Sequence, residues 1–115
     1  MWKLSLMPVL ALLLVSIPAR SQKIFKVRYE SQADIKVYVV KYESQCDLKV
    51  FLVGYESQAD EEGLWYMVKY ESQADVKVFF VDYESKADLR IFRVKYESQA
   101  GWRNPEKMHL LMLPR

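Results

Sequence analysis

Apolar and polar residues alternate in short runs along most of this chain. In the run that starts at Ile35, Val37 and Val39 share one set of alternate positions with Ile35, and Tyr38 and Val40 share the other. Similar runs begin at Leu48, Val76 and Leu89. This alternation, rich in β-branched and aromatic residues, predicts strands. One face of each run is aliphatic and the other aromatic, so we expect strands that are covered on both faces or that close on themselves.

The hexapeptide Tyr-Glu-Ser-Gln-Ala-Asp separates these runs and recurs six times with small variations. Successive copies start 13 residues apart, except for one step of 15. Within each copy, Ser followed three residues later by Asp predicts a miniature capping box, in which Asp reaches back to the Ser N–H. Either one helical turn or a tight four-residue loop is expected there. The copies open at Tyr29, Tyr42, Tyr55, Tyr70, Tyr83 and Tyr96.

The repeat is broken in two places. Asp60-Glu61-Glu62-Gly63 carries the two extra residues of the longer step, and Gly101 replaces the Asp of the sixth copy. Gly101 predicts a positive φ and a change in chain direction. The apolar stretch Lys107 to Leu113 then predicts a seventh strand.

A fixed period repeated six times dictates the architecture. An open solenoid would stack the six glutamates of the repeat in one column and leave strand edges free, and both features are unfavourable. We therefore expect an all-β fold with six 13-residue strand–turn repeats plus a C-terminal strand in one compact closed β-structure.

Residues 1–21 have the layout of a secretory signal peptide. Lys3 provides a basic start, residues 4–17 are mostly apolar, and Ala19 and Ser21 occupy the −3 and −1 positions of a cleavage site. The alternative, an uncleaved membrane anchor, needs about 20 apolar residues, more than this run contains. We predict a signal peptide at 1–21, a β-repeat domain at 22–115, and a secreted or periplasmic location.

Removal of the signal peptide changes the charge of the protein. The whole chain has 17 basic and 15 acidic residues, and the leader contains only Lys3 and Arg20, so residues 22–115 carry 17 − 2 = 15 basic and 15 acidic residues. A neutral, evenly mixed surface argues against nucleic acid and, after cleavage, against a membrane as partners. We expect a monomer whose partner is unknown.

The single cysteine, Cys46, cannot form an internal disulfide. It occupies the place of alanine in the other copies, which favours a small buried residue; an intermolecular disulfide or a reactive thiol is the alternative.

Five copies place Glu and Asp four residues apart, a spacing that could serve acid–base chemistry or calcium. Five equivalent pairs favour structural capping instead, because catalysis needs one differentiated pair. The only histidine, His109, has no nucleophile marked out beside it, and a surface or packing role is expected. We predict no enzymatic activity, no metal site and no cofactor. The pairs are Glu30/Asp34, Glu43/Asp47, Glu56/Asp60, Glu71/Asp75 and Glu84/Asp88.

The aromatic residues are the remaining candidate for function. We expect an aromatic stripe, formed by the repeat tyrosines with Tyr38, Phe51, Phe79 and Phe92, to pack in the core or stack, with a carbohydrate- or peptide-binding surface as the alternative. Trp65 and Trp102 lie near the two breaks in the repeat, where a unique site is most expected. They are the candidates for a ligand or capping surface, and we favour a plug role for Trp102.

The copies at 41–47 and 69–75, with the closing segment Lys95 to Trp102, resemble the small bacterial Tyr-Glu-Ser-Gln-Ala-Asp repeat proteins. Through them the chain resembles the septoil-knot domain family, whose short strands wind into a deeply knotted seven-crossing torus knot. The resemblance covers essentially all of residues 22–115. It implies no assigned activity and no functional residues. We therefore expect an uncharacterised exported β-repeat domain that acts as a non-enzymatic binding or structural module, with a surface assembly or adhesion subunit as the alternative.

Overall fold

A computed structural model describes residues 22–112. The predicted signal peptide at 1–21 lies outside the described residues. Six strands carry the alternating runs, and each is followed by a single 3-10 turn that contains the Glu-Ser-Gln of a repeat (Glu-Ser-Lys in η6). The strands are β1 (Lys23–Lys26), β2 (Ile35–Val39), β3 (Leu48–Leu52), β4 (Leu64–Met67), β5 (Val76–Phe80) and β6 (Leu89–Arg93). The turns are η2 (Glu30–Gln32), η3 (Glu43–Gln45), η4 (Glu56–Gln58), η5 (Glu71–Gln73), η6 (Glu84–Lys86) and η7 (Glu97–Gln99).

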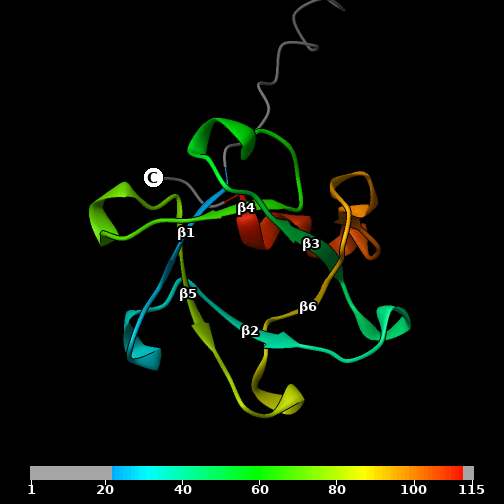
Figure 1. The fold of residues 1–115 in the computed structure, drawn as a ribbon. Helices are drawn as coiled ribbons and strands as arrows, with labels where there is room; N and C mark the ends of the chain where they lie inside the picture. Colours follow the sequence, from blue (N-terminus) through cyan, green and yellow to red (C-terminus); the bar gives the residue numbers. More distant parts are fainter. Residues whose placement is uncertain (1–21, 113–115) are drawn as a thin grey trace, which may run out of the picture.

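The six strands form a closed, all-parallel barrel. Hydrogen bonds join them in the order β4-β1-β5-β2-β6-β3, and β3 pairs with β4 to complete the ring. Seen down the barrel, the strands surround the centre and the turns project outward (Figure 1). The expected closed β-structure is confirmed, and closure leaves the ring without the long free edges of a solenoid.

Strands that follow one another in the first half of the sequence do not touch. β5 lies between β1 and β2, and β6 lies between β2 and β3. The chain therefore goes round the barrel twice, and its second circuit fills the places left open by the first.

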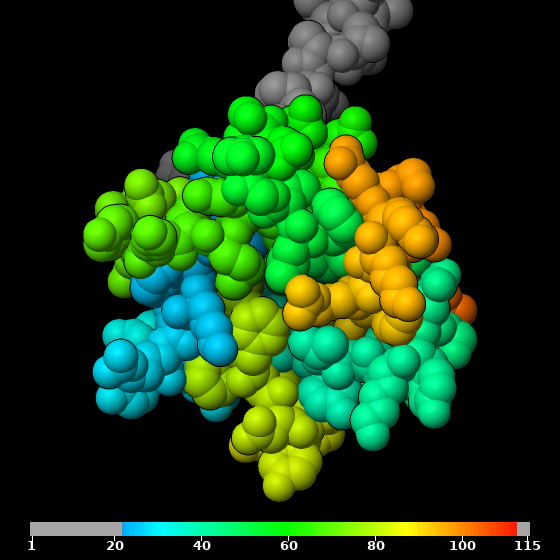
Figure 2. All heavy atoms as spheres, in the orientation of Figure 1, coloured from blue at the N-terminus to red at the C-terminus, as the bar shows by residue number. Residues whose placement is uncertain are grey.

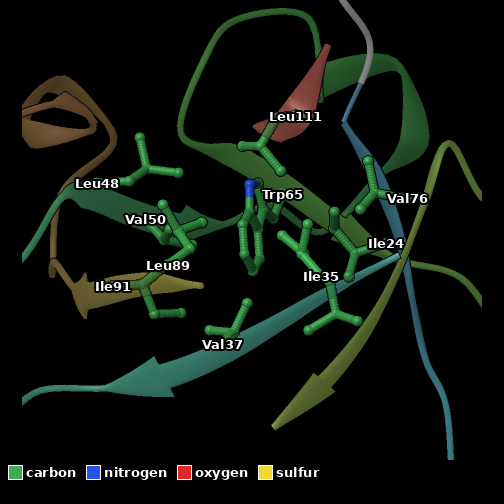
Figure 3. Packing of buried hydrophobic residues seen from close by; sticks show 11 residues of the cluster. Ile24, Ile35, Val37, Leu48, Val50, Trp65, Val76, Leu89, Ile91 and Leu111 are labelled. Carbon is green, nitrogen blue, oxygen red and sulfur yellow. The ribbon is translucent and has the colours of Figure 1, made fainter. Parts of the chain in front are cut away.

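The barrel interior is built from three sets of six repeat-equivalent positions, because every second residue of a strand points inward. The middle set is almost completely buried and includes Trp65 (Figure 3). The set nearest the start of the strands is also buried, although it contains the polar Gln22 and the side-chain-free Gly63. The first set is Gln22, Ile35, Leu48, Gly63, Val76 and Leu89; the middle set is Ile24, Val37, Val50, Trp65, Val78 and Ile91.

The C-terminal segment closes the end of the barrel where the strands begin. The backbone N–H groups of Arg103 and Asn104 donate to the carbonyl of Asp47, just before β3, and Lys107 Nζ donates to the carbonyl of Asp88, just before β6. The side chain of Leu111 then reaches the main core (Figure 3).

The predicted strand at Lys107 to Leu113 is wrong. Residues Pro105–Leu111 form a 3-10 helix, η8, and Leu113 lies outside the described residues. The seventh strand is instead β7 (Gly101–Trp102), which pairs antiparallel with Leu48 and Lys49 outside the ring. Pro105 at the first helical positions explains the difference, since it favours a helix start there. Among residues 22–112, no helix has the length and apolar character needed to span a membrane.

Candidate binding surface

The six repeat tyrosines lie on the surface, so the prediction that they pack in the core is wrong. Their exposed fractions run from 61% for Tyr29 to 73% for Tyr55. Each precedes a 3-10 turn in an extended conformation, and its carbonyl accepts an N–H from the last residue of that turn; for Tyr42 the distance is 3.0 Å. The chain leaves the strand at this point, which carries the tyrosine away from the barrel wall.

Ion pairs connect the turns to the barrel wall. In four repeats the turn glutamate faces a cation six residues later, as in Glu71–Lys77 at 3.3 Å and Glu84–Arg90 at 3.0 Å. Such exposed pairs contribute little stability. They occupy the glutamates, however, so these carboxylates are not free partners for the neighbouring aspartates.

The repeat aspartates hold the backbone of a distant strand. The carboxylate of Asp34 accepts the N–H of Lys77 at 2.8 Å, and the Asp34 N–H donates to the Lys77 carbonyl at 2.7 Å. This reach to another strand replaces the predicted reach to the Ser N–H. We call the two-bond arrangement the aspartate clip. It recurs between Asp47 and Arg90, Asp75 and Lys23, and Asp88 and Lys36.

Asp47 forms the most buried clip, with only 1% of its surface exposed. Its carboxylate also receives Arg90 Nη2 at 3.3 Å and Asn104 Nδ2 at 3.2 Å. Burial acts against the charged form, but the hydrogen bonds from Arg90 and Asn104 and the charge of Arg90 prevail and hold the pKa of Asp47 below its usual value.

In four of the five Glu/Asp pairs the glutamate and the aspartate therefore have separate structural tasks. The described part of the chain contains no group of three or more His, Cys, Asp and Glu side chains able to hold a metal ion. His109 is exposed on η8, with Nδ1 3.1 Å from the Glu106 carbonyl. Cys46 is a free, buried thiol, and burial raises its pKa.

The two tryptophans lie at the core rather than on an exposed platform. Trp65 is 1% exposed and its indole points toward Leu111 in the barrel centre (Figure 3). Trp102 is half-buried on β7 and packs against the same core cluster. Neither indole Nε1 has a hydrogen-bond partner among the described residues. The plug role of Trp102 stays a prediction, with a test given below.

The residues at the open end of the barrel are not among the candidates predicted from the sequence. The third inward-facing set, at the ends of the strands, is half-buried or exposed. Aligning the copies on their tyrosines would have found it, since each member precedes a tyrosine by three residues. The set is Lys26, Val39, Leu52, Met67, Phe80 and Arg93. We call this surface the barrel mouth.

One family model matches residues 21–103, and its description is the 7(1) septoil knot domain. The interleaved strand order fits this description, since β5 lies between β1 and β2, β6 lies between β2 and β3, and β1 lies between β4 and β5. No curated protein and no solved structure matches the chain.

Proposed function

The chain belongs to the 7(1) septoil knot domain family, and from this premise we propose that it is an exported, non-enzymatic module that binds its partner through the six repeat tyrosines. Its partner is a carbohydrate or a peptide. Export rests on the leader-like residues 1–21, with Gln22 as the first residue after cleavage.

The exposure of all six tyrosines carries the proposal. A tyrosine presents a large apolar ring and a hydroxyl, and it loses little conformational freedom on contact. The six side chains stand at equivalent points of a closed barrel, so contacts to a repeating polymer add up. Linked weak contacts of this kind raise overall affinity by orders of magnitude without any single strong site.

The absence of a marked catalytic group supports the non-enzymatic part. Five of the six repeat glutamates pair with cations, and the buried Asp47 is held by Arg90 and Asn104. A hydrolase is disfavoured because no nucleophile–histidine pair stands out among the described residues. Turnover of a glycan, peptide or ester panel that disappears on mutation of one Glu/Asp pair would contradict this part.

The test replaces tyrosines in groups. Three variants are compared with wild type on glycan and peptide arrays. One changes Tyr29, Tyr55 and Tyr83 to Ser, the second changes Tyr42, Tyr70 and Tyr96 to Ser, and the sixfold variant changes all six. Exposed substitutions leave stability nearly unchanged, which urea denaturation checks. We expect binding to fall in each triple variant and to vanish in the sixfold one. Binding that survives the sixfold change contradicts the proposal.

Export is tested separately. The full chain is expressed in a bacterial host, and the exported fraction is examined by intact mass. We expect a product that begins at Gln22. A full-length product that stays with the membrane contradicts the cleavage and supports an anchor.

Surface assembly is the second candidate, favoured by the six equivalent exposed surfaces, which could contact copies of themselves. Closure of the barrel opposes it, since few strand edges remain for pairing. Size-exclusion chromatography and dye binding after long incubation separate the two. A sharp monomer peak without fibrils excludes assembly.

A further inference from the structure

The barrel mouth combines an apolar centre with two opposed cations. Following the strand order round the ring, Lys26 on β1 stands between Met67 and Phe80, and Arg93 on β6 stands between Val39 and Leu52. Lys26 Nζ lies 5.7 Å from the centre of the Phe80 ring, a cation–π distance. Val39 is 42% exposed.

This end of the barrel is the one that η8 does not cover. The red η8 helix of Figure 1 is hidden in Figure 2, which therefore looks at the opposite end. In Figure 2 the side chains of the strands fill the centre of this face, and no described helix lies over them. The mouth is thus a filled, outward-facing surface rather than a channel.

More cations surround the mouth where the chain leaves each strand. The residue directly before the repeat tyrosine is exposed in all six copies and basic in four of them. In the other two copies this residue is Gly54 or Asp82, so Asp82 is the one acidic residue among these six positions. The four basic residues are Arg28, Lys41, Lys69 and Lys95.

The cations of the mouth differ from those at the start of the strands in their pairing. Lys36, Lys49 and Lys77 face turn glutamates within 3.9 Å. By contrast, none of the six mouth cations forms an ion pair with a residue of the described range 22–112. Although residues 22–115 have zero net charge, their charges are therefore unevenly placed, with unpaired cations gathered at the mouth. The expectation of no membrane partner assumed an even mixture, which this face does not have.

We propose that the barrel mouth docks on an anionic lipid bilayer. Phospholipid headgroups supply anionic partners for Lys26, Arg93 and the four basic residues that precede repeat tyrosines. The acyl boundary just below the headgroups accepts the apolar centre of the mouth. A soluble acidic polymer satisfies only the cations and leaves Phe80 and Met67 in water. The inference concerns a different surface from the tyrosine turns and does not depend on their ligand.

The test measures partition onto vesicles of phosphatidylcholine alone and of phosphatidylcholine with phosphatidylglycerol. The sample is the protein recovered after expression of the full chain, with the same N-terminus in every variant. We expect binding only to the anionic vesicles, weakened by added salt because screening shortens the reach of the charges. One cation near an anionic surface is worth about fivefold in partition, so K26E/R93E should lower binding by at least about 25-fold.

Two further variants give the proposal its control and its spectroscopic test. K86E/R103E makes the same charge change on Lys86 in η6 and Arg103 after β7, away from the mouth, and should change binding less than about threefold. V39W places an indole at the exposed Val39. Its fluorescence should shift to the blue on anionic vesicles, as expected for a tryptophan that enters the interface.

The outcomes separate the possible partners. No partition to anionic vesicles, equal partition to neutral ones, or equal loss in K86E/R103E overturns the proposal. Binding to a soluble polyanion such as polyglutamate as tight as to vesicles, without a V39W shift, also overturns it and points to an acidic polymer. The sixfold tyrosine variant on anionic vesicles distinguishes the two surfaces. If this variant retains vesicle binding, the mouth acts independently of the tyrosine turns. If this variant loses vesicle binding while K26E/R93E retains it, the mouth is not the docking face.

Discussion

Asp47 and Arg90 hold each other through both backbone and side chain. The Asp47 N–H donates to the Arg90 carbonyl at 2.7 Å, the Arg90 N–H donates back to Asp47 Oδ2 at 2.9 Å, and the guanidinium bonds Oδ1 at 3.3 Å. The two residues are 43 positions apart in sequence. Through Asn104 the same carboxylate also holds the segment that covers the start of the strands.

Replacing Asp47 by Ala should destabilise the protein by about 2–4 kcal/mol, since it removes the buried carboxylate that accepts from the partly buried donors of Arg90 and Asn104. Asp47→Asn keeps the shape but loses the charge-assisted bonds, and we expect a cost of about 1.5–3 kcal/mol. Asp34→Asn, in the exposed clip, is the matched control and should cost about 1 kcal/mol. Urea denaturation measures the three values; equal costs at Asp34 and Asp47 contradict this account.

The same clip predicts a pH dependence. Because the folded-state pKa of Asp47 is lowered from its ordinary 3.8, the charged carboxylate contributes stability that is fully present above that value. The contribution is lost as the pH falls below 3.8 through the folded-state pKa. The free-energy difference between wild type and Asp47→Asn should therefore shrink from pH 6 toward pH 2. A constant difference over this range refutes the linkage.

Gly63 should tolerate no side chain. Its φ is +89°, and a Cβ would lie 2.6 Å from the Lys49 carbonyl oxygen and 2.7 Å from the Gly101 nitrogen, where β3, β7 and the start of β4 meet. Gly63→Ala must therefore move backbone, at a cost of about 3 kcal/mol or more. Gly54→Ala is the control, because its nearest neighbour is Gln58 Oε1 at 4.0 Å, and should stay within about 1 kcal/mol of wild type. Thermal midpoints compare the two.

Trp102→Ala should cost about 3–5 kcal/mol if Trp102 acts as a plug on the core. Trp102→Phe, which keeps an apolar ring, should recover more than half of that loss. Thermal melting of both variants gives the answer. An unchanged midpoint for Trp102→Ala, together with loss of ligand capture, would instead assign Trp102 to a binding surface.

Cys46 should behave as a buried apolar residue. Burial shields its sulfur and raises the pKa of the thiol, so little thiolate is available at neutral pH. We expect a thiol reagent to react only when the protein opens, at a rate that rises with urea. Cys46→Ala, the residue of the other copies, should change stability by less than about 1.5 kcal/mol. Fast labelling in buffer, or a disulfide dimer without reductant, disproves this view.

The strands and turns could be predicted from the sequence because their period is local. The alternation that starts at Ile35, Leu48, Val76 and Leu89 reappears as four strands with those first residues. The strand order could not be predicted from periodicity, because near-identical repeats offer near-identical partners and nothing in one copy says which other copy it pairs with.

The candidate site was harder to predict than the fold. An apolar ring predicts burial, yet a tyrosine placed where the chain turns away from the wall, as at Tyr42, stays exposed. The aspartates looked like local caps because a capping box is read within four residues, whereas Asp34 binds a residue 43 positions away. The apolar run after Lys107 resembled a strand, but Pro105 begins a 3-10 helix there.

The two-circuit path has a consequence for the order in which the protein can form. β1, β2 and β3 form no hydrogen-bonded pair with one another, and all their partners lie later in the sequence, so a growing chain that has released only its first half has no sheet to fold into. Nearly all of its pairings join residues far apart in sequence, which makes folding slow. Until β4 is present the polypeptide therefore has no strand pairing to hold it folded, the condition in which a chain can still be threaded through a narrow pore.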